Sequence, residues 1–333
     1  MKLVAFPNDG GVSVIIPEIQ KYEKNNNFMK FRPYHEFMFR KISEYIIKKT
    51  GKGNIIDLGA WIGDNSIPWA KMIKDYGIVY AIDPSPDNCE YISTLCELNN
   101  VTNVRIVQKP ISDKEEVIST GGDLWHCSFK PGEEGKIKLT ATSIDNLKDI
   151  IKDVSYIHLD VEGMEYNVLI GAEKLIRELN PIICYEVHLS EVENVTKIKS
   201  LLKSWDYEIY MINEVLPECN IDCRNCLALP RTGGCLGKSP EDVILDICKY
   251  LNEGKYHIIS HVKGVTRKSN YKTLTEAMNV FCMLNGGPYA TVLLETQEES
   301  SSKILCKYGM EQYAELCISS HRYSYENIFT TVS

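Results

Sequence analysis

Four residues that can accept a proton or bind a cation follow two apolar stretches of the sequence. Asp160 and Glu162 come just after "YIHL", and Glu186 and His188 end the stretch "PIICYEVH". A carboxylate or an imidazole in such a position can act as the general base for a hydroxyl group. Asp160, Glu186 and His188 could instead hold a divalent cation that lowers the pKa of that hydroxyl. We favour direct base catalysis, because these residues offer few oxygen ligands to a hard cation.

The same residues also have structural interpretations. Glu162 precedes Gly163 and a predicted helix, so its charge could stabilise the helix N-terminus. His188 could be a surface residue at a strand end, and we expect Glu165 to face the N-terminus of that same helix.

A glycine-containing turn lies in "NIIDLGAWIGDNS", residues 54–66, where a strand is predicted to turn sharply into a helix. Asp57, Gly59 and Gly63 lie in the turn, but neither G-x-G-x-x-G nor G-x-x-x-x-G-K-[ST] is present. Trp61 stands where a dinucleotide fold needs a glycine, so that the backbone can approach a pyrophosphate. Taken alone, the turn is also compatible with a purely structural connection.

An acidic residue at the end of the next predicted strand narrows the choice of ligand. Asp83 lies twenty residues after Gly63 and is placed to accept hydrogen bonds from ribose hydroxyls. A nucleoside without a pyrophosphate fits both features. S-adenosylmethionine is such a nucleoside, and its sulfonium and amino group favour an acidic turn. The sequence therefore predicts this cofactor, bound by Asp57, Gly59, Ala60, Trp61, Gly63, Asp83 and Pro84.

Four cysteines are clustered in "CNIDCRNCLALPRTGGC", at positions 219, 223, 226 and 235. The first three have the spacing that radical S-adenosylmethionine enzymes use for an iron–sulfur cluster. We reject that interpretation, because too few residues follow the motif to build a βα barrel. A zinc site formed by Cys219, Cys223, Cys226 and Cys235 is possible. Thiols without a metal are favoured.

Strands and helices alternate through the region that contains these motifs. This order predicts an α/β fold with a Rossmann-like, doubly wound and mostly parallel sheet, whose ligands bind at the carboxyl ends of its strands. A β-rich insertion is expected over residues 114–143. Helices are predicted over residues 34–49, 66–76, 86–100, 165–179 and 191–204, with Ser85 capping the third.

Several blocks in this order and spacing resemble the FkbM-type methyltransferases, a branch of the class I S-adenosylmethionine-dependent enzymes. They are "IIDLGAWIGDNSIPWAK", "VYAIDPSPDNCEYISTLCELNNVTNVRIV", "ATSIDNL" and "HLDVEGMEYNVLIGAEKLIRELNPIICYEVH", and "NCLALP" is similar to that family's last strand. The resemblance covers about residues 34–230. It implies a seven-stranded sheet, donor binding at Asp57 to Gly63 and at Asp83, and O-methylation of a hydroxyl, often on a sugar or a natural product. Trp61 departs from the family, which commonly has a small polar residue there.

The resemblance and the composition of the flanking regions divide the chain into three parts. We expect an N-terminal extension over residues 1–33, the methyltransferase domain over 34–232 and a small α+β domain over 237–333. The last domain could serve substrate docking or dimerisation, so a homo-oligomer is possible. Its His257 and His261 share one strand face, and packing or solvent exposure explains them better than metal binding.

The overall charge limits the partners. The formal net charge of the 333 residues is -8, and no segment concentrates Lys and Arg, which disfavours a nucleic-acid partner. The N-terminal apolar patches are too short for a leader or a membrane span, so we expect a cytoplasmic protein without a membrane partner. Twelve scattered cysteines fit a reducing compartment. The resemblance to the FkbM-type methyltransferases implies a small-molecule or glycan acceptor. A nucleotide-dependent oxidoreductase and a non-catalytic S-adenosylmethionine-binding protein remain as alternatives.

Overall fold

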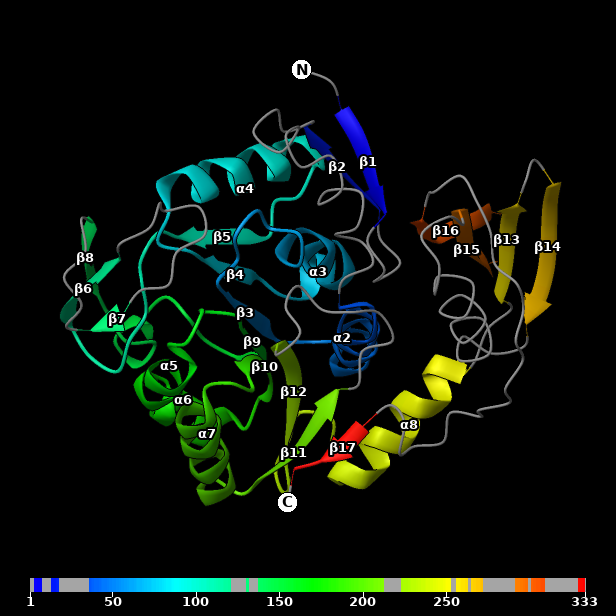
Figure 1. The fold of residues 1–333 in the computed structure, drawn as a ribbon. Helices are drawn as coiled ribbons and strands as arrows, with labels where there is room; N and C mark the ends of the chain where they lie inside the picture. Colours follow the sequence, from blue (N-terminus) through cyan, green and yellow to red (C-terminus); the bar gives the residue numbers. More distant parts are fainter. Residues whose placement is uncertain are drawn as a thin grey trace. The chain divides into compact units, whose positions relative to one another are not determined.

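The computed structural model describes eleven stretches of the chain (Figure 1). These are residues 3–7, 13–17, 36–120, 130–131, 137–212, 223–252, 256–262, 265–271, 291–298, 301–308 and 329–332. The chain divides into two compact units. Unit 1 comprises Met1–Tyr45, Asn213–Cys219 and Ile244–Phe329, and unit 2 comprises Ile46–Ile212, Asn220–Val243 and Thr330–Ser333.

Unit 2 is built on a twisted sheet with the strand order β17-β11-β12-β10-β9-β3-β4-β5. Strands β3, β4, β5, β9 and β10 pair in parallel, and β12 is antiparallel to both β10 and β11. The strands are β3 (Asn54–Leu58), β4 (Val79–Ile82), β5 (Val104–Val107), β9 (Val154–Leu159), β10 (Ile182–His188), β11 (Tyr207–Ile212), β12 (Cys223–Pro230) and β17 (Phe329–Thr331).

The predicted mostly parallel sheet of seven strands is confirmed, and one further strand is added to it. Seven of the strands come from residues 54–230, and the short C-terminal strand β17 extends the sheet beyond β11 as an eighth. The three residues "FTT" carry no periodic pattern and lie about 100 residues beyond the rest of the sheet, so this pairing could not be predicted from the sequence.

The central strands are buried on both faces, which explains their nearly continuous apolar sequences. Every residue of β9 is buried, and so are all those of β4. Helices cover both sides of the sheet (Figure 1). One side carries α3 (Ser66–Ile73) and α4 (Pro86–Leu98), and the other carries α5 (Glu165–Gly171), α6 (Glu173–Leu179) and α7 (Val192–Ser204).

The ends of the helices follow local capping. Ser85 caps α4 as predicted, since its hydroxyl accepts a hydrogen bond from the backbone N–H of Asn88. The helix predicted over 66–76 ends as an α-helix at Ile73 and continues as the 3₁₀ turn η3 (Lys74–Tyr76). The single helix predicted over 165–179 is wrong, because the chain breaks it at Ala172. The Asp145 carboxylate accepts the N–H groups of Lys174 and Leu175, and thereby caps α6 as a separate helix.

The predicted β-rich insertion is confirmed as a small antiparallel sheet with the order β7-β6-β8. Its strands are β6 (Glu116–Thr120), β7 (Lys130–Pro131) and β8 (Ile137–Ala141), and the 3₁₀ turn η4 (Asp145–Leu147) leads on to β9.

Unit 1 contains the hairpin of β1 (Leu3–Pro7) and β2 (Ser13–Pro17) and a four-stranded antiparallel sheet with the order β14-β13-β15-β16. These strands are β13 (Tyr256–Val262), β14 (Val265–Tyr271), β15 (Thr291–Glu298) and β16 (Ser301–Tyr308). Helices α2 (Phe37–Thr50) and α8 (Pro240–Asn252) each run across the division between the units. His257 and His261 lie on β13, but their side chains are outside the described part of the structure.

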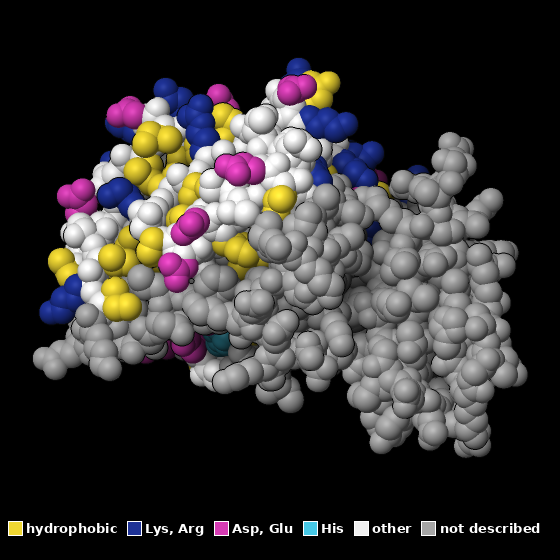
Figure 2. Space-filling model, turned by 90° about the horizontal axis from the view of Figure 1, so that it is seen from above, with side chains coloured by type: hydrophobic (Ala, Val, Ile, Leu, Met, Phe, Trp, Pro, Cys, Tyr) yellow, Lys and Arg dark blue, Asp and Glu magenta, His cyan; other side chains and the backbone are white. Residues whose placement is uncertain are grey.

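Two surface properties bear on the predicted partners. Among the described residues, none of the helices combines the length and the apolar character that crossing a membrane requires. Lys and Arg side chains are interspersed with Asp and Glu on the face seen in Figure 2. On that face the described basic residues do not gather into one patch.

Candidate functional site

The order of the strands identifies the edge of the sheet at which a ligand is expected. The chain runs from β3 through β4 to β5 on one side, and then returns to β9 on the other side of β3. In open α/β sheets, ligands bind at such a reversal, outside the carboxyl ends of the strands. Gly59 follows β3 and Asp160 follows β9, so both residues lie at the edge of the sheet where a ligand is expected.

Gly59 makes this close meeting of backbones possible. Its φ is +77°, and a Cβ atom built on it would lie 1.7 Å from the carbonyl oxygen of Asp160. The Asp160 N–H donates to the Leu58 carbonyl at 3.0 Å, which keeps the two strand ends together. Only glycine combines the left-handed conformation with this approach.

The amides of the turn are already used within the protein. Gly59 and Ala60 donate to the Ile82 carbonyl at 3.0 and 3.1 Å, and Gly63 donates to the Ala60 carbonyl at 2.7 Å. The Trp61 N–H donates to Asp83 Oδ2 at 2.9 Å. A phosphate-binding loop needs such N–H groups to point at its ligand. These amides are therefore not arranged as a pyrophosphate cradle.

Trp61 has the backbone conformation of a glycine although it carries a large side chain. Its φ is +44°, in the left-handed region that residues with a Cβ rarely adopt. The side chain is half-buried. The turn therefore holds a left-handed backbone at a residue with a large aromatic side chain.

Asp83 is held firmly at the end of β4. Its Oδ1 accepts hydrogen bonds from the Ser85 N–H at 2.8 Å and from Asn88 Nδ2 at 3.0 Å, in addition to the Trp61 bond to Oδ2. Burial raises the pKa of Asp83 to about 6 from an ordinary 3.8, although these hydrogen bonds act in the opposite direction. A carboxylate has about four acceptor positions. One position on Oδ2 is therefore left for a ligand hydroxyl, and Pro84 beside it is half-buried.

Asp57 faces the interior and has partners that the sequence analysis missed. Its side chain is 1% exposed, its Oδ1 lies 2.8 Å from His158 Nδ1, and its Oδ2 accepts the Ser66 hydroxyl. Asp57 and His158 are paired in register on adjacent parallel strands, and His158 packs edge-on against Trp69 of α3. In this arrangement, Asp57 supports the turn from the interior of the protein. The two residues are 101 positions apart in the sequence, and the strand register brings them together.

Three of the predicted catalytic residues, Glu186, His188 and Glu162, have side chains that lie close together. His188 Nε2 is 3.9 Å from Glu186 Oε2 and 3.4 Å from Glu162 Oε2. The side chain of Glu186 is 6% exposed, that of His188 18% and that of Glu162 51%. Asp160 is half-buried at the end of β9, next to Gly59. The roles of these four residues remain predictions.

Glu165 has the structural role that was considered for Glu162. Its carboxylate accepts the N–H groups of Gly163 at 3.0 Å and Val161 at 3.3 Å, and Asn194 donates to its other oxygen. Burial raises the pKa of Glu165. Glu162, in contrast, has a φ of +52° and is exposed near His188.

The described members of the cysteine cluster do not lie together. Cys223 Sγ is 3.4 Å from His188 Nδ1, at the carboxyl end of β10. Cys226 belongs to the hydrophobic core, and Cys235 Sγ lies 3.5 Å from the Ser155 carbonyl, near the start of β9. Cys219 lies outside the described residues. A zinc site that includes Cys223, Cys226 and Cys235 is therefore contradicted, because β9 and β10 are parallel and these cysteines lie at different levels of the sheet.

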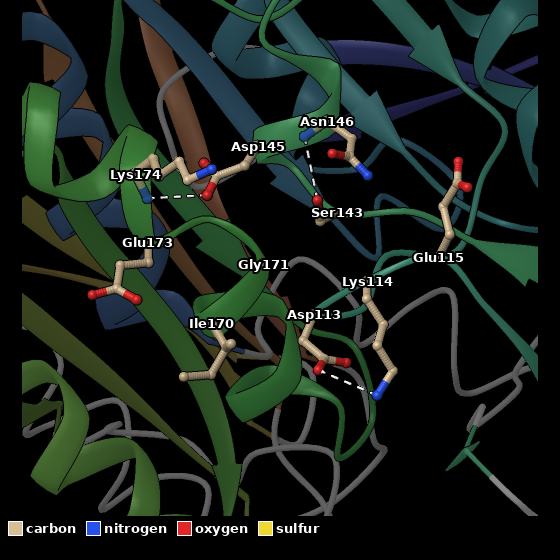
Figure 3. Close-up of a pocket in the computed structure, with 10 residues that line it drawn as sticks. All are labelled: Asp113, Lys114, Glu115, Ser143, Asp145, Asn146, Ile170, Gly171, Glu173 and Lys174. Atoms are coloured by element: carbon tan, nitrogen blue, oxygen red, sulfur yellow. Dashed lines mark hydrogen bonds and ion pairs between the residues drawn. The ribbon is translucent and has the colours of Figure 1, made fainter.

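A cavity of about 400 Å³ lies elsewhere in unit 2, between η4, the junction of α5 and α6, and the segment before β6 (Figure 3). Lys114 forms an ion pair with Asp113 at its wall, and Asp145 accepts the Lys174 N–H there. None of the predicted donor-binding or catalytic residues is among its described lining residues. These are Asp113, Lys114, Glu115, Ser143, Asp145, Asn146, Ile170, Gly171, Glu173 and Lys174.

Comparison with known families gives one match. Residues 57–209 match the family model of the methyltransferase FkbM domain. The matched segment begins at Asp57 and includes Asp83, Glu186 and His188, but it ends before Cys223. None of the curated proteins matches the chain.

Solved structures that are similar to this chain include two methyltransferases. A methyltransferase FkbM from Methylobacillus flagellatus KT is 18% identical with a TM-score of 0.41, and the match covers 54% of this chain and 44% of that one. This chain thus spans less than half the length of that relative. An S-adenosylmethionine-dependent methyltransferase from Aquifex aeolicus is 14% identical with a TM-score of 0.39, over 62% of this chain and 96% of that one.

Proposed function

We propose that this chain, whose residues 57–209 match the family model of the methyltransferase FkbM domain, transfers a methyl group from S-adenosylmethionine to an acceptor hydroxyl. The observation that carries the proposal is the set of hydrogen bonds around Asp83. They leave an acceptor position for a ribose hydroxyl while the amides of the neighbouring turn are used internally. This arrangement suits a nucleoside without a pyrophosphate.

The residues present fit the proposed cofactor. Asp83 would accept a ribose hydroxyl at Oδ2, and the left-handed backbone at Gly59 and Gly63 shapes the turn beside it. Trp61 and Pro84 offer half-buried apolar surface beside Asp83. When bound, S-adenosylmethionine supplies a methyl group activated by its sulfonium. The carboxylates of Asp57 and Asp83 give the turn the negative charge that a cationic ligand favours.

The acceptor hydroxyl must lose its proton, and the side chains after β9 and β10 could accept it. In our proposal, Glu186 or His188 takes this proton, and the carboxylate of Glu162, 3.4 Å from His188 Nε2, stabilises the imidazolium that would form there. Asp160 would help to orient the hydroxyl at the neighbouring strand end. Positioning the acceptor in line with the methyl group supplies much of the acceleration of such a displacement. A divalent cation on Asp160, Glu186 and His188 is the alternative way to lower the pKa of the hydroxyl.

The acceptor that we propose is a hydroxyl of a glycan or a small metabolite. A net charge of -8 opposes non-specific attraction to a nucleic acid. The internal use of the turn amides and the side chain of Trp61 count against a nucleotide-dependent oxidoreductase.

Calorimetric titration tests the proposal. Wild-type protein is titrated with S-adenosylmethionine and, separately, with NAD, and so are the Asp83→Ala and Asp87→Ala variants. Asp87 is an exposed acid in the first turn of α4 and is the matched control. We expect micromolar binding of S-adenosylmethionine, at least about tenfold weaker in Asp83→Ala because a charge-assisted hydrogen bond is lost, and unchanged in Asp87→Ala.

Binding of NAD in place of S-adenosylmethionine, or donor binding that is indifferent to Asp83, would overturn the proposal. Glu186→Gln separates an enzyme from a non-catalytic binding protein. In an enzyme, it retains donor binding and loses methyl transfer to the acceptor found by screening.

A further inference from the structure

A cysteine, a histidine and a glutamate converge at the carboxyl end of β10. Glu186 and His188 come from this strand, and Cys223 is the first residue of β12, paired in register with His188. One potential ligand atom from each of the three lies within 4.8 Å of the other two. Residues separated by 35 positions in the sequence are thus brought to one point by the antiparallel pairing.

The spacing of these atoms is close to what a tetrahedral metal imposes on its ligands. Zinc binds sulfur at about 2.3 Å and nitrogen at about 2.0–2.1 Å, so tetrahedral angles place the two ligand atoms about 3.6 Å apart. Cys223 Sγ and His188 Nδ1 are 3.4 Å apart. Small side-chain movements of Glu186 would bring its carboxylate to the same centre.

The other nitrogen of the imidazole also fits this arrangement. With Nδ1 directed at the centre, Nε2 faces the carboxylate of Glu162 at 3.4 Å. Histidines that bind metals usually donate their second N–H to a carboxylate or a carbonyl, which fixes the ring and raises its basicity. Glu162 is the residue placed to accept this hydrogen bond.

The three side chains differ in their exposure to solvent, which favours a metal site that is buried on one side and accessible to a ligand from solvent on the other. Cys223 is 0% exposed and the side chain of Glu186 is 6% exposed, whereas that of His188 is 18% exposed. Three protein ligands leave a fourth tetrahedral position for an oxygen ligand from outside, as in catalytic zinc sites.

We propose that Cys223, His188 and Glu186 bind a zinc-class transition-metal ion, with Glu162 orienting the histidine. A thiolate and an imidazole favour Zn²⁺ or Co²⁺ over Mg²⁺ and Ca²⁺, which prefer ligand sets made of oxygen. On binding, the Cys223 thiol gives its proton to the solvent and the thiolate sulfur becomes the ligand. With the metal bound, Glu186 and His188 would be ligands and not the proton acceptor, and the metal would instead lower the pKa of an acceptor hydroxyl at the fourth position. That step rests on the proposed methyl transfer, but the metal site itself does not.

This ligand set differs from both sets expected from the sequence. It takes one residue from the cysteine cluster and two from the strand-end residues. Asp160 is not among the atoms that lie within 4.8 Å of one another. Cys223 lies beyond the end of the family match at residue 209, so the site joins the matched domain to the strand that follows it.

Titration of the full-length, chelator-treated protein with Co²⁺ tests the site. Tetrahedral Co²⁺ bound to a thiolate gives intense visible bands and a sulfur-to-metal charge-transfer band in the near ultraviolet. We expect about one equivalent to bind, with displacement by Zn²⁺. Cys223→Ser should lose the charge-transfer band and weaken binding at least about 100-fold, because a thiolate ligand is removed.

Cys226→Ser is the matched control for Cys223→Ser. Cys226 is a buried cysteine on the same strand, but alternation along β12 places it on the other face, within the hydrophobic core. This variant should keep both the stoichiometry and the spectrum. Loss of the charge-transfer band in Cys226→Ser as well would contradict the assignment of the thiolate to Cys223.

Two further substitutions address the remaining roles. His188→Gln, at a half-buried position that tolerates replacement, should also weaken Co²⁺ binding at least about 100-fold, and Glu162→Gln about tenfold. Absence of stoichiometric Co²⁺ and Zn²⁺ binding by the folded wild-type protein would overturn the proposal. All of these readouts are independent of methyl transfer, so failure of the metal site and failure of the proposed function can be distinguished.

Discussion

The turn after β3 and the cluster after β10 lie at the same edge of one sheet, but they are built from different parts of the chain. In the turn, the N–H groups of Gly59, Ala60 and Gly63 are bound to nearby backbone carbonyls. In the cluster, His188 and Cys223 are partners on two antiparallel strands, and their side chains also contact each other. The first region is fixed by backbone conformation and the second by side-chain placement.

This difference predicts different responses to mutation. A change in the turn should disturb the fold, because a backbone hydrogen bond or a left-handed conformation depends on it. A change at the exposed Glu162 should leave the fold intact and alter only local chemistry. Substitutions in the turn and at the buried Asp57 therefore test this difference, and their expected effects on the free energy of unfolding span a wide range.

Gly59→Ala should have the largest effect. The added Cβ would lie 1.7 Å from the Asp160 carbonyl oxygen, and neither backbone can move without parting β3 from β9. We expect a loss of more than about 3 kcal/mol in the free energy of unfolding, from the clash together with the left-handed strain. Urea unfolding followed by circular dichroism measures this loss.

Gly237→Ala is the matched control for this prediction. Gly237 also has a positive φ, +61°, but nothing lies within 4 Å of a Cβ built there. It should lose only about 1 kcal/mol, the cost of the left-handed conformation. Equal losses at the two glycines would show that β3 and β9 do not meet as described.

Asp57→Ala should have the next largest effect. It leaves His158 buried at 2% exposure without its carboxylate partner, and it removes the acceptor of the Ser66 hydroxyl. We expect a loss of about 3 kcal/mol in the free energy of unfolding, because two buried hydrogen-bonding side chains lose their common partner. Ser66→Ala removes only one hydrogen bond to Asp57 and should lose about 1 kcal/mol.

Donor affinity distinguishes a structural role of Asp57 from a direct one. Unchanged stability of Asp57→Ala combined with a large loss of S-adenosylmethionine binding would mean that Asp57 contacts the donor. That result would contradict the inward orientation of its carboxylate.

Asp83 should make stability depend on pH. The pKa of Asp83 is about 6 in the folded protein, above the ordinary 3.8. Burial disfavours the ionised form of its side chain, and the nearby Asp57 raises the pKa further by a smaller amount. The contribution of Asp83 to stability is therefore complete below about pH 4 and is lost as the pH rises through 6. Between pH 5 and 7.5, wild type should lose about 1.5 kcal/mol relative to Asp83→Asn.

Urea unfolding of both proteins at the two pH values gives this difference directly. Asp87→Asn, which changes an exposed acid on the neighbouring helix, should follow wild type. A wild type that gains stability relative to Asp83→Asn as the pH rises would show that the hydrogen bonds to Asp83 outweigh its burial.

The sequence could predict the turn because its determinants are local. Glycines with positive φ, the acid at the end of β4 and the Ser85 cap each act within a few residues, and the alternation of strands and helices indicated the sheet. The break at Ala172 was not predictable, because the cap of α6 comes from Asp145, far back in the sequence.

Residues that depend on strand register were also missed. His158 meets Asp57 across 101 positions, and Cys223 meets His188 across 35. A shift of one residue in either pairing would turn these side chains to opposite faces of the sheet. The sequence indicated where the strands lie, but it did not show which side chains of neighbouring strands would face each other.

Trp61 provides the smallest and most local comparison, between Trp61→Gly and Trp61→Ala. Both variants lose the indole ring, so their difference isolates the cost of a Cβ at a φ of +44°. The left-handed strain of about 1–2 kcal/mol is partly offset by the greater freedom of glycine in the unfolded chain. We therefore expect Trp61→Gly to be more stable than Trp61→Ala by about 0.5–1 kcal/mol in urea unfolding. If Trp61→Ala were the more stable of the two, the turn would not hold its left-handed conformation in solution, and the contrast between a backbone-fixed turn and a side-chain cluster would fail at this residue.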